Sequence, residues 1–96
     1  MANRELYPIK RIALEVCAKH NVKYISIIGK RRSRSIAWPR QEIYWRAYNE
    51  TGASLPEIGS ALGGRDHTTI LHGVRAYARR NGLESGLRSG EKYGAT

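Results

Sequence analysis

The chain has 96 residues, enough for one small domain with a single core but too few for a second domain. It carries 17 Lys and Arg against 8 Asp and Glu, and the formal net charge of +9 indicates an anionic partner, either nucleic acid or an acidic membrane surface. Its single cysteine excludes an intramolecular disulfide. The chain has neither an apolar run long enough to span a membrane nor a signal peptide, so we expect a cytoplasmic protein.

The first expected helix begins at Pro8. Apolar residues recur from Ile9 to Cys17 at the spacing of one helix face, and Asn21 is the expected end. The basic residues of this segment fall mostly off that stripe, which favours a solvated face over a binding site. We therefore interpret the helix as core scaffold, with residues 1–7 as an N-terminal extension.

A short ambiguous segment and a basic run follow. Residues 22–28 alternate like a strand at their start, so that periodicity alone leaves a strand and a short helix both open. From Lys30 to Arg34, four of five residues are basic. This run is a solvated charge cluster, a localisation-type patch, or an arm that contacts the DNA backbone or enters an A·T-rich minor groove, where the negative potential is enhanced.

A longer helix is expected from Ser35 or Ala37 to about Asn49, with Pro39 in or near its first turn. Arg40 and Gln41, close to its N-terminus, are placed to hold phosphate. Its large aromatic residues are interpreted as packing residues rather than as a base-stacking platform; they are Trp38, Trp45 and Tyr48.

Two further helices are predicted with a short turn between them. Ser54 to Glu57 form a capping box, so a helix should begin at Leu55, and it should end at about Leu62. Gly63-Gly64 supplies a left-handed exit, and Asp66 is placed to cap the second helix. Such a pair is typical of a helix-turn-helix.

The second of these helices has the pattern of a DNA-reading helix. Its apolar residues fall on one stripe, while its first turn carries His67, Thr68 and Thr69. At a helix N-terminus such side chains can bind phosphate or base edges, Asp66 can accept from a cytosine amine, and a threonine methyl can pack on a thymine methyl. The alternative is that Asp66 is only a cap and the threonines are ordinary polar surface. Beyond Arg80 the periodicity is lost, which predicts a flexible tail over 82–96.

Two blocks of this sequence, residues 54–72 and 30–41, closely resemble the DNA-binding C-terminal domain of the bacterial replication initiator DnaA. The blocks are SLPEIG followed by GGRDHTTILH, and KRRSRSIAWPRQ, in the family's order and at its separation. The resemblance implies an all-α fold, in which a basic loop precedes a helix-turn-helix, over residues 8–81. It also favours the short helix for residues 22–28.

The resemblance implies a role for each matching residue. Arg32 would enter the minor groove, Asp66, His67 and Thr68 would approach bases in the major groove, and Pro56 would pack on a thymine methyl. Arg40, Gln41 and Thr69 would hold the phosphate backbone. To these we add the neighbouring basic residues as expected backbone contacts: Lys30, Arg31, Arg34, Arg65 and Arg75. The element read would be a DnaA box, close to TTATCCACA.

The sequence departs from the family pattern at four positions. Trp38 stands where a basic residue is usual, Tyr48 and Ala76 replace common lysines, and Gly73 replaces an alanine inside the second helix. Losing cations that bind phosphate should weaken sequence-independent binding, and Gly73 should cost the helix about 0.5–1 kcal/mol relative to alanine.

We expect a non-enzymatic, nucleoid-associated protein that binds double-stranded DNA singly at each site, without a cofactor, metal or nucleotide. No Gly-x-x-x-x-Gly-Lys-[Ser/Thr] loop is present, so the ATPase of a complete initiator is not expected. The natural-looking N-terminus favours a stand-alone protein, acting as a transcriptional regulator or a competitor of replication initiation. The alternative is a protein-interaction module that uses its basic face for an acidic partner. A metal-dependent hydrolase is disfavoured, because His67 and His72 do not share a helix face.

Overall fold

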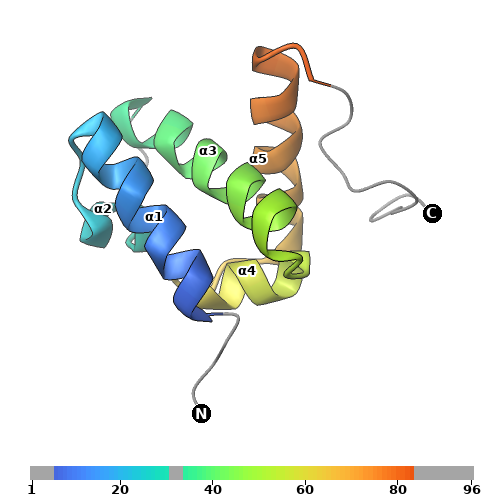
Figure 1. Ribbon diagram of the computed structural model, residues 1–96, viewed down its shortest axis with the longest axis horizontal. Helices are drawn as coiled ribbons and strands as arrows, with labels where there is room; N and C mark the ends of the chain where they lie inside the picture. The colour runs from blue at the N-terminus through green and yellow to red at the C-terminus, as the bar shows by residue number, and fades with distance from the viewer. Residues whose placement is uncertain (1–5, 31–33, 84–96) are drawn as a thin grey trace.

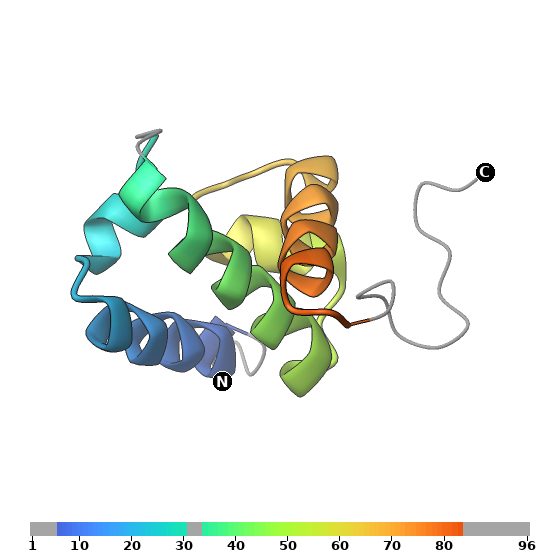
Figure 2. The same ribbon diagram turned by 90° about the horizontal axis from the view of Figure 1, so that it is seen from above.

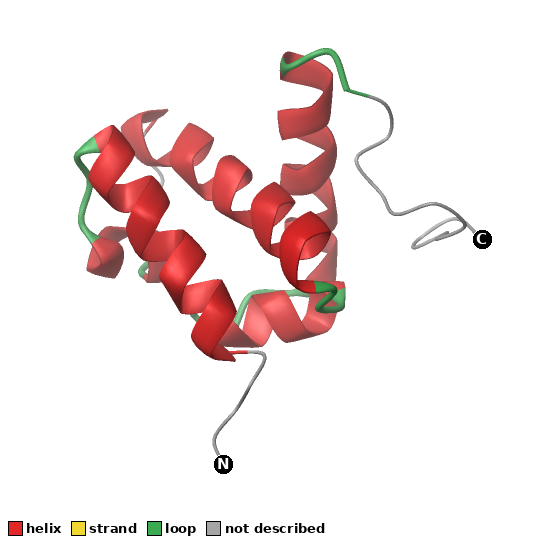
Figure 3. Cartoon of the chain, viewed as in Figure 1, coloured by secondary structure: helices red, strands yellow, loops and turns green. Residues whose placement is uncertain are grey.

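A computed structural model describes residues 6–30 and 34–83, and within these ranges the chain folds into five helices (Figure 1, Figure 3). The expected all-α class is confirmed. The helices are α1 (Leu6–His20), α2 (Tyr24–Ile28), α3 (Arg34–Thr51), α4 (Leu55–Ala61) and α5 (His67–Arg80).

Helix α3 lies at the centre of the molecule. It packs against α1 on one side and α5 on the other (Figure 2), and α4 contacts α1, α3 and α5. The core is apolar and built from every helix: its largest fully buried side chains include Ile9, Ile12, Ile27, Ile43, Tyr48, Leu55, Ile58, Leu62, Ile70 and Val74. This core fixes the position of α5, the second helix of the helix-turn-helix, against α3.

The helix boundaries partly match those expected from the sequence. The short helix expected for residues 22–28 is present as α2. Helix α1 begins at Leu6, so the last two residues of the expected extension 1–7 are helical, while residues 1–5 and the expected flexible tail from residue 84 onward lie outside the described residues. Helix α3 is longer than expected at both ends.

The start of α3 lies one residue before Ser35, the earlier of the two expected starts. A proline disfavours helical geometry in the residue before it, which favours a start no earlier than a few residues before Pro39. In the structure α3 begins at Arg34 and runs through Pro39. Ile36 is only 4% exposed in the core cluster, so burial of this early turn outweighs the local preference of the proline.

The start of α4 and the turn that follows this helix have the expected geometry. Ser54 accepts a hydrogen bond from the Glu57 amide at 3.2 Å, and the Glu57 carboxylate accepts from the Ser54 amide at 2.8 Å, which confirms the capping box. Gly63 has a φ of +100°, and a β-carbon there would lie 2.3 Å from the Ile28 carbonyl oxygen. Only glycine fits this turn, which brings α2 and the start of α5 together.

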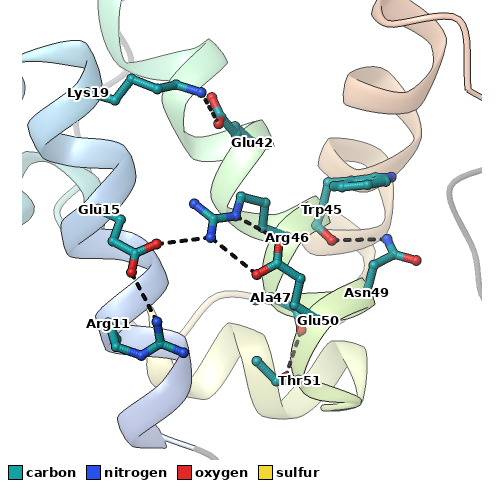
Figure 4. Close-up of polar contacts among 10 residues, drawn as sticks. All are labelled: Arg11, Glu15, Lys19, Glu42, Trp45, Arg46, Ala47, Asn49, Glu50 and Thr51. Atoms are coloured by element: carbon teal, nitrogen blue, oxygen red, sulfur yellow. Dashed lines mark hydrogen bonds and ion pairs between the residues drawn. The ribbon is translucent and has the colours of Figure 1, made fainter.

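The face between α1 and α3 is neutralised by ion pairs (Figure 4). Arg46 bonds both Glu15 of α1 and Glu50 of its own helix, each at 2.9 Å. Glu42, only 6% exposed, accepts from Lys19 and His20 at the other end of the same face. Acidic side chains therefore balance the cations on the side of α3 that faces away from α5.

Candidate nucleic-acid interface

The N-terminus of α5 is capped as expected by Asp66. Its Oδ2 accepts from the Thr68 amide at 2.9 Å and also from the Thr68 hydroxyl. The Thr68 hydroxyl, followed by the Thr68 amide, holds the pKa of Asp66 below its usual range, so the carboxylate stays ionised at neutral pH. Because the Thr68 hydroxyl donates its hydrogen to Asp66, Thr68 can offer a partner its methyl group or an oxygen lone pair but no donor.

The first turn of α5 is open to solvent. His67, Thr68 and Thr69 are all exposed, and the second carboxylate oxygen of Asp66 lies 3.9 Å from His67 Nδ1. The turn therefore presents an acceptor, an imidazole, a methyl group and a hydroxyl at the positive end of a helix dipole. These are the groups that hydrogen-bond and pack against base edges in a major groove.

A groove of about 610 Å³ runs between α3 and α5. It brings together five of the residues expected to contact the DNA backbone: Arg40, Gln41, Arg65, Thr69 and Arg75. His72 and Arg79 line it too, although neither was among the expected contacts. Arg79 follows Arg75 by one helical turn, and this spacing is the signal that could have identified it.

A second cleft, of about 470 Å³, lies where the end of α2 meets the turn of the helix-turn-helix. Lys30, at the start of the basic run, lines it together with Arg65 and Asp66. The base of the expected DNA-binding arm and the first turn of α5 thus border one cleft, although they are far apart in the sequence.

Arg40 and Arg65 have a structural role that the sequence did not indicate. Arg40 donates to the carbonyl oxygens of Ser26, Ile27 and Gly29 at 2.8–2.9 Å, and Arg65 donates to those of Ile27, at 3.1 Å, and Gly29. These carbonyls at the end of a short helix would otherwise lack partners. Together the two guanidinium groups anchor the segment that leads into the basic run, and their expected phosphate contacts stay predictions.

The remaining expected contact residues are placed as follows. Pro56 is exposed in the first turn of α4, outside both clefts. Arg31 and Arg32 lie outside the described residues, and Arg34 is the first residue of α3, with its side chain not described. The structure therefore brings the first turn of α5 close to most of the residues expected to contact the DNA backbone. Of the expected minor-groove arm, the described residues include only Lys30, at its start.

The three aromatic residues interpreted as packing residues, Trp38, Trp45 and Tyr48, take three different positions. Tyr48 is fully buried, so its ring is part of the core. Trp45 packs on Tyr77 with ring centroids 5.2 Å apart. Both confirm the expected packing role, but that expectation is wrong for Trp38, which is 60% exposed and lies under the Arg80 guanidinium.

The described ranges 6–30 and 34–83 contain no group of three or more His, Cys, Asp or Glu side chains that could hold a metal ion. Within the same ranges, no helix is long and apolar enough to cross a membrane.

Comparison with known proteins agrees with this geometry. Residues 9–76 match the family described as bacterial dnaA protein helix-turn-helix, which covers α2 to α4 completely and most of α1 and α5. Over 67 residues the chain is 49% identical to the chromosomal replication initiator protein DnaA of two Cereibacter sphaeroides strains, ATCC 17029 and ATCC 17023. The alignment covers 70% of this chain but only 15% of each relative. No solved structure matches the chain.

Proposed function

Since the chain belongs to the bacterial DnaA helix-turn-helix family, we propose that it binds double-stranded DNA and recognises elements resembling the DnaA box. The observation that carries this proposal is the junction of two features. A capped, solvent-exposed first turn of α5 adjoins a groove lined by four arginines, Arg40, Arg65, Arg75 and Arg79. Phosphate contacts position such a domain, and base contacts select its site.

In this proposal the start of α5 enters the major groove. Asp66 accepts from a base amine, the Thr68 methyl packs on a thymine methyl, and His67 contacts a base edge. Pro56 reaches a neighbouring thymine methyl from α4. Arg32 would enter the adjacent minor groove, carried by the segment that Arg40 and Arg65 anchor.

The phosphate backbone would be held along the groove between α3 and α5. Gln41, Thr69 and Arg75 supply hydrogen-bond donors there, and Arg40 and Arg65 also line the groove. The basic run supplies the remaining expected contacts, Lys30, Arg31 and Arg34. The ion pairs on the α1 side leave the acidic side chains Glu15, Glu42 and Glu50 away from this surface, so the charge distribution favours approach of DNA from the α5 side.

We infer that the protein regulates by occupying its DNA sites, without catalysis. The chain spans 15% of the length of the curated relatives it matches. Bound singly at a box-like element, it would repress or activate a promoter, or compete with an initiator for its sites.

The test is fluorescence-anisotropy binding of the full chain to a duplex containing TTATCCACA and to a scrambled duplex of equal composition, across a salt series. The proposal predicts a preference for the box that persists as salt rises, because base contacts release few counterions. Equal and steeply salt-dependent binding to both duplexes would reject base recognition. Absence of binding to either duplex at low salt would instead favour a protein partner for the basic face.

A further inference from the structure

Trp38 and Arg80 connect two helix ends that diverge. The first turns of α3 and the last turn of α5 stand apart at the top of Figure 1. The Arg80 guanidinium of α5 reaches across to the Trp38 ring of α3. Its central carbon lies 4.3 Å from the centroid of the Trp38 ring and 5.7 Å from that of Tyr77. An arginine over an aromatic face is restrained while its edge stays open to a further partner.

Arg80 also determines how Gln41 is oriented. It donates from Nη1 to Oε1 of the Gln41 side chain. Because a guanidinium has only donors, the carbonyl side of this amide must face Arg80. The amide nitrogen, which can donate to an anion, is therefore turned away from Arg80 on a residue that lines the groove between α3 and α5.

We propose that Arg80, laid over Trp38 and bonded to Gln41, forms a DNA phosphate site at the open end of the α3–α5 groove. Arg80 contacts a backbone phosphate directly, and Trp38 acts as a positioning residue for it. The inference rests on the proposed DNA binding. It extends the proposed interface to Arg80, the last residue of α5, beyond the contacts implied by the family resemblance.

The charge around the site favours a phosphate rather than a protein carboxylate. Gln41, to which Arg80 is bonded, lines the groove together with Arg75 and Arg79, so Arg80 adds a further α5 cation beside this groove. Cations gathered beside one groove attract the phosphates of a DNA strand. Arg80 thereby restores, from the other helix, the positive charge that tryptophan removes at position 38.

The experiment measures how the binding constant of the full chain for the box duplex depends on salt. One phosphate contact contributes about 0.9 to the slope of log K against log salt. Arg80→Ala should lower the slope by about 0.9 and weaken binding on the order of fivefold at about 0.15 M salt, equally on box and scrambled duplexes. Arg11→Ala is the matched control, because it removes the same charge from α1, where Arg11 pairs with Glu15.

Trp38→Leu tests whether Trp38 affects DNA binding only by positioning the Arg80 guanidinium. It should weaken binding when Arg80 is present and have no further effect in the Arg80→Ala background, because the ring acts through the guanidinium. Arg80→Lys should keep the salt slope and lose part of the affinity, since lysine keeps the charge but not the planar contact.

The outcomes distinguish this inference from the function on which it rests. If Arg80→Ala and Arg11→Ala behave alike while the wild-type chain still prefers the box, the phosphate site is wrong and the proposed function stands. Additive effects of Trp38→Leu and Arg80→Ala would overturn the positioning role. If the wild-type chain binds no duplex at low salt, both proposals fail.

Discussion

The ring of Tyr44 on α3 fills the space that a β-carbon on Gly73 of α5 would need. An ideal β-carbon at Gly73 would lie 2.5 Å from Tyr44 Cδ2, and Tyr44 is only 3% exposed. The absence of a side chain at Gly73 therefore lets the Tyr44 ring lie directly against the backbone of α5. This contact lies on the wall of the groove that we propose for the DNA backbone.

Gly73→Ala should destabilise the protein, although alanine is the better helix former. The gain in helix propensity is about 0.5–1 kcal/mol, whereas overpacking a filled core costs about 1–3 kcal/mol. We expect a net loss of about 1 kcal/mol, seen as a fall of about 4–8 °C in the thermal midpoint. Tyr44→Leu combined with Gly73→Ala should recover part of the loss. A more stable Gly73→Ala single variant would contradict the packing described here.

Arg40→Lys should destabilise the protein even though it keeps the positive charge. Three carbonyl oxygens of the α2 end accept from Arg40, and a lysine cannot reproduce that planar set of donors. Hydrogen bonds to a charged donor contribute about 1.5–3 kcal/mol each, so we expect a loss of about 2 kcal/mol in urea denaturation. Unchanged stability would mean that Arg40 serves DNA alone.

The stability of the protein should fall in acid as the Glu42 carboxylate takes up a proton. Burial acts to raise the pKa of Glu42, but hydrogen bonds from Lys19 and His20 outweigh it and hold this pKa below its usual range. The unfolded chain, with a value of about 4.3, therefore takes up the proton first on acidification. The contribution of Glu42 is complete above that pH and is lost as the pH falls through the folded-state pKa.

Glu42→Gln is the variant that measures this contribution. At neutral pH it should be less stable than the wild-type chain by about 1 kcal/mol, since the charged hydrogen bonds are weakened. The difference should shrink in acid denaturation profiles once the wild-type carboxyl is protonated. Glu57→Gln, on the exposed capping box, provides a comparison at a carboxylate outside the core. A gap between Glu42→Gln and wild type that is constant down to the acid limit would argue against the described ion pairs.

Substitutions at Thr68 should separate its methyl from its hydroxyl. The hydroxyl donates to Asp66, so in our proposal the methyl contacts the base. Thr68→Ser should lose about 1 kcal/mol of preference for the box over the scrambled duplex, the contribution of one buried methyl group. Thr68→Val, which keeps the methyl, should retain more of that preference. Competition binding measures both, and a serine variant with wild-type preference would place the base contact elsewhere.

Local signals in the sequence predicted the helix-turn-helix well. The capping box at Ser54, the Gly63-Gly64 exit and the Asp66 cap each depend on neighbours within three residues, and the structure has all of them. The sequence leaves the start of α3 open between Ser35 and Ala37, and the structure extends the helix to Arg34, with Ile36 of this first turn buried in the core.

Contacts between residues far apart in the chain could not be predicted from the pattern of the sequence. The sequence predicts only phosphate contacts for Arg40 and Arg65, because nothing local shows that the α2 carbonyls lie within their reach. The pairing of Trp38 with Arg80 likewise depends on the crossing of α3 and α5. Gly73 looked like a simple cost to helix stability, and only the position of Tyr44 reveals what the glycine permits.

The most direct test of the central claim, base recognition by the first turn of α5, is a binding profile across single base-pair changes in TTATCCACA. We predict that changes at the positions read by the protein cost about 1–3 kcal/mol each and add roughly for separated positions. In the Thr68→Ser variant, the cost at one thymine position should largely disappear while the others persist. Indistinguishable dissociation constants across the whole set would contradict the account, because they would mean that the protein binds only the charge of DNA.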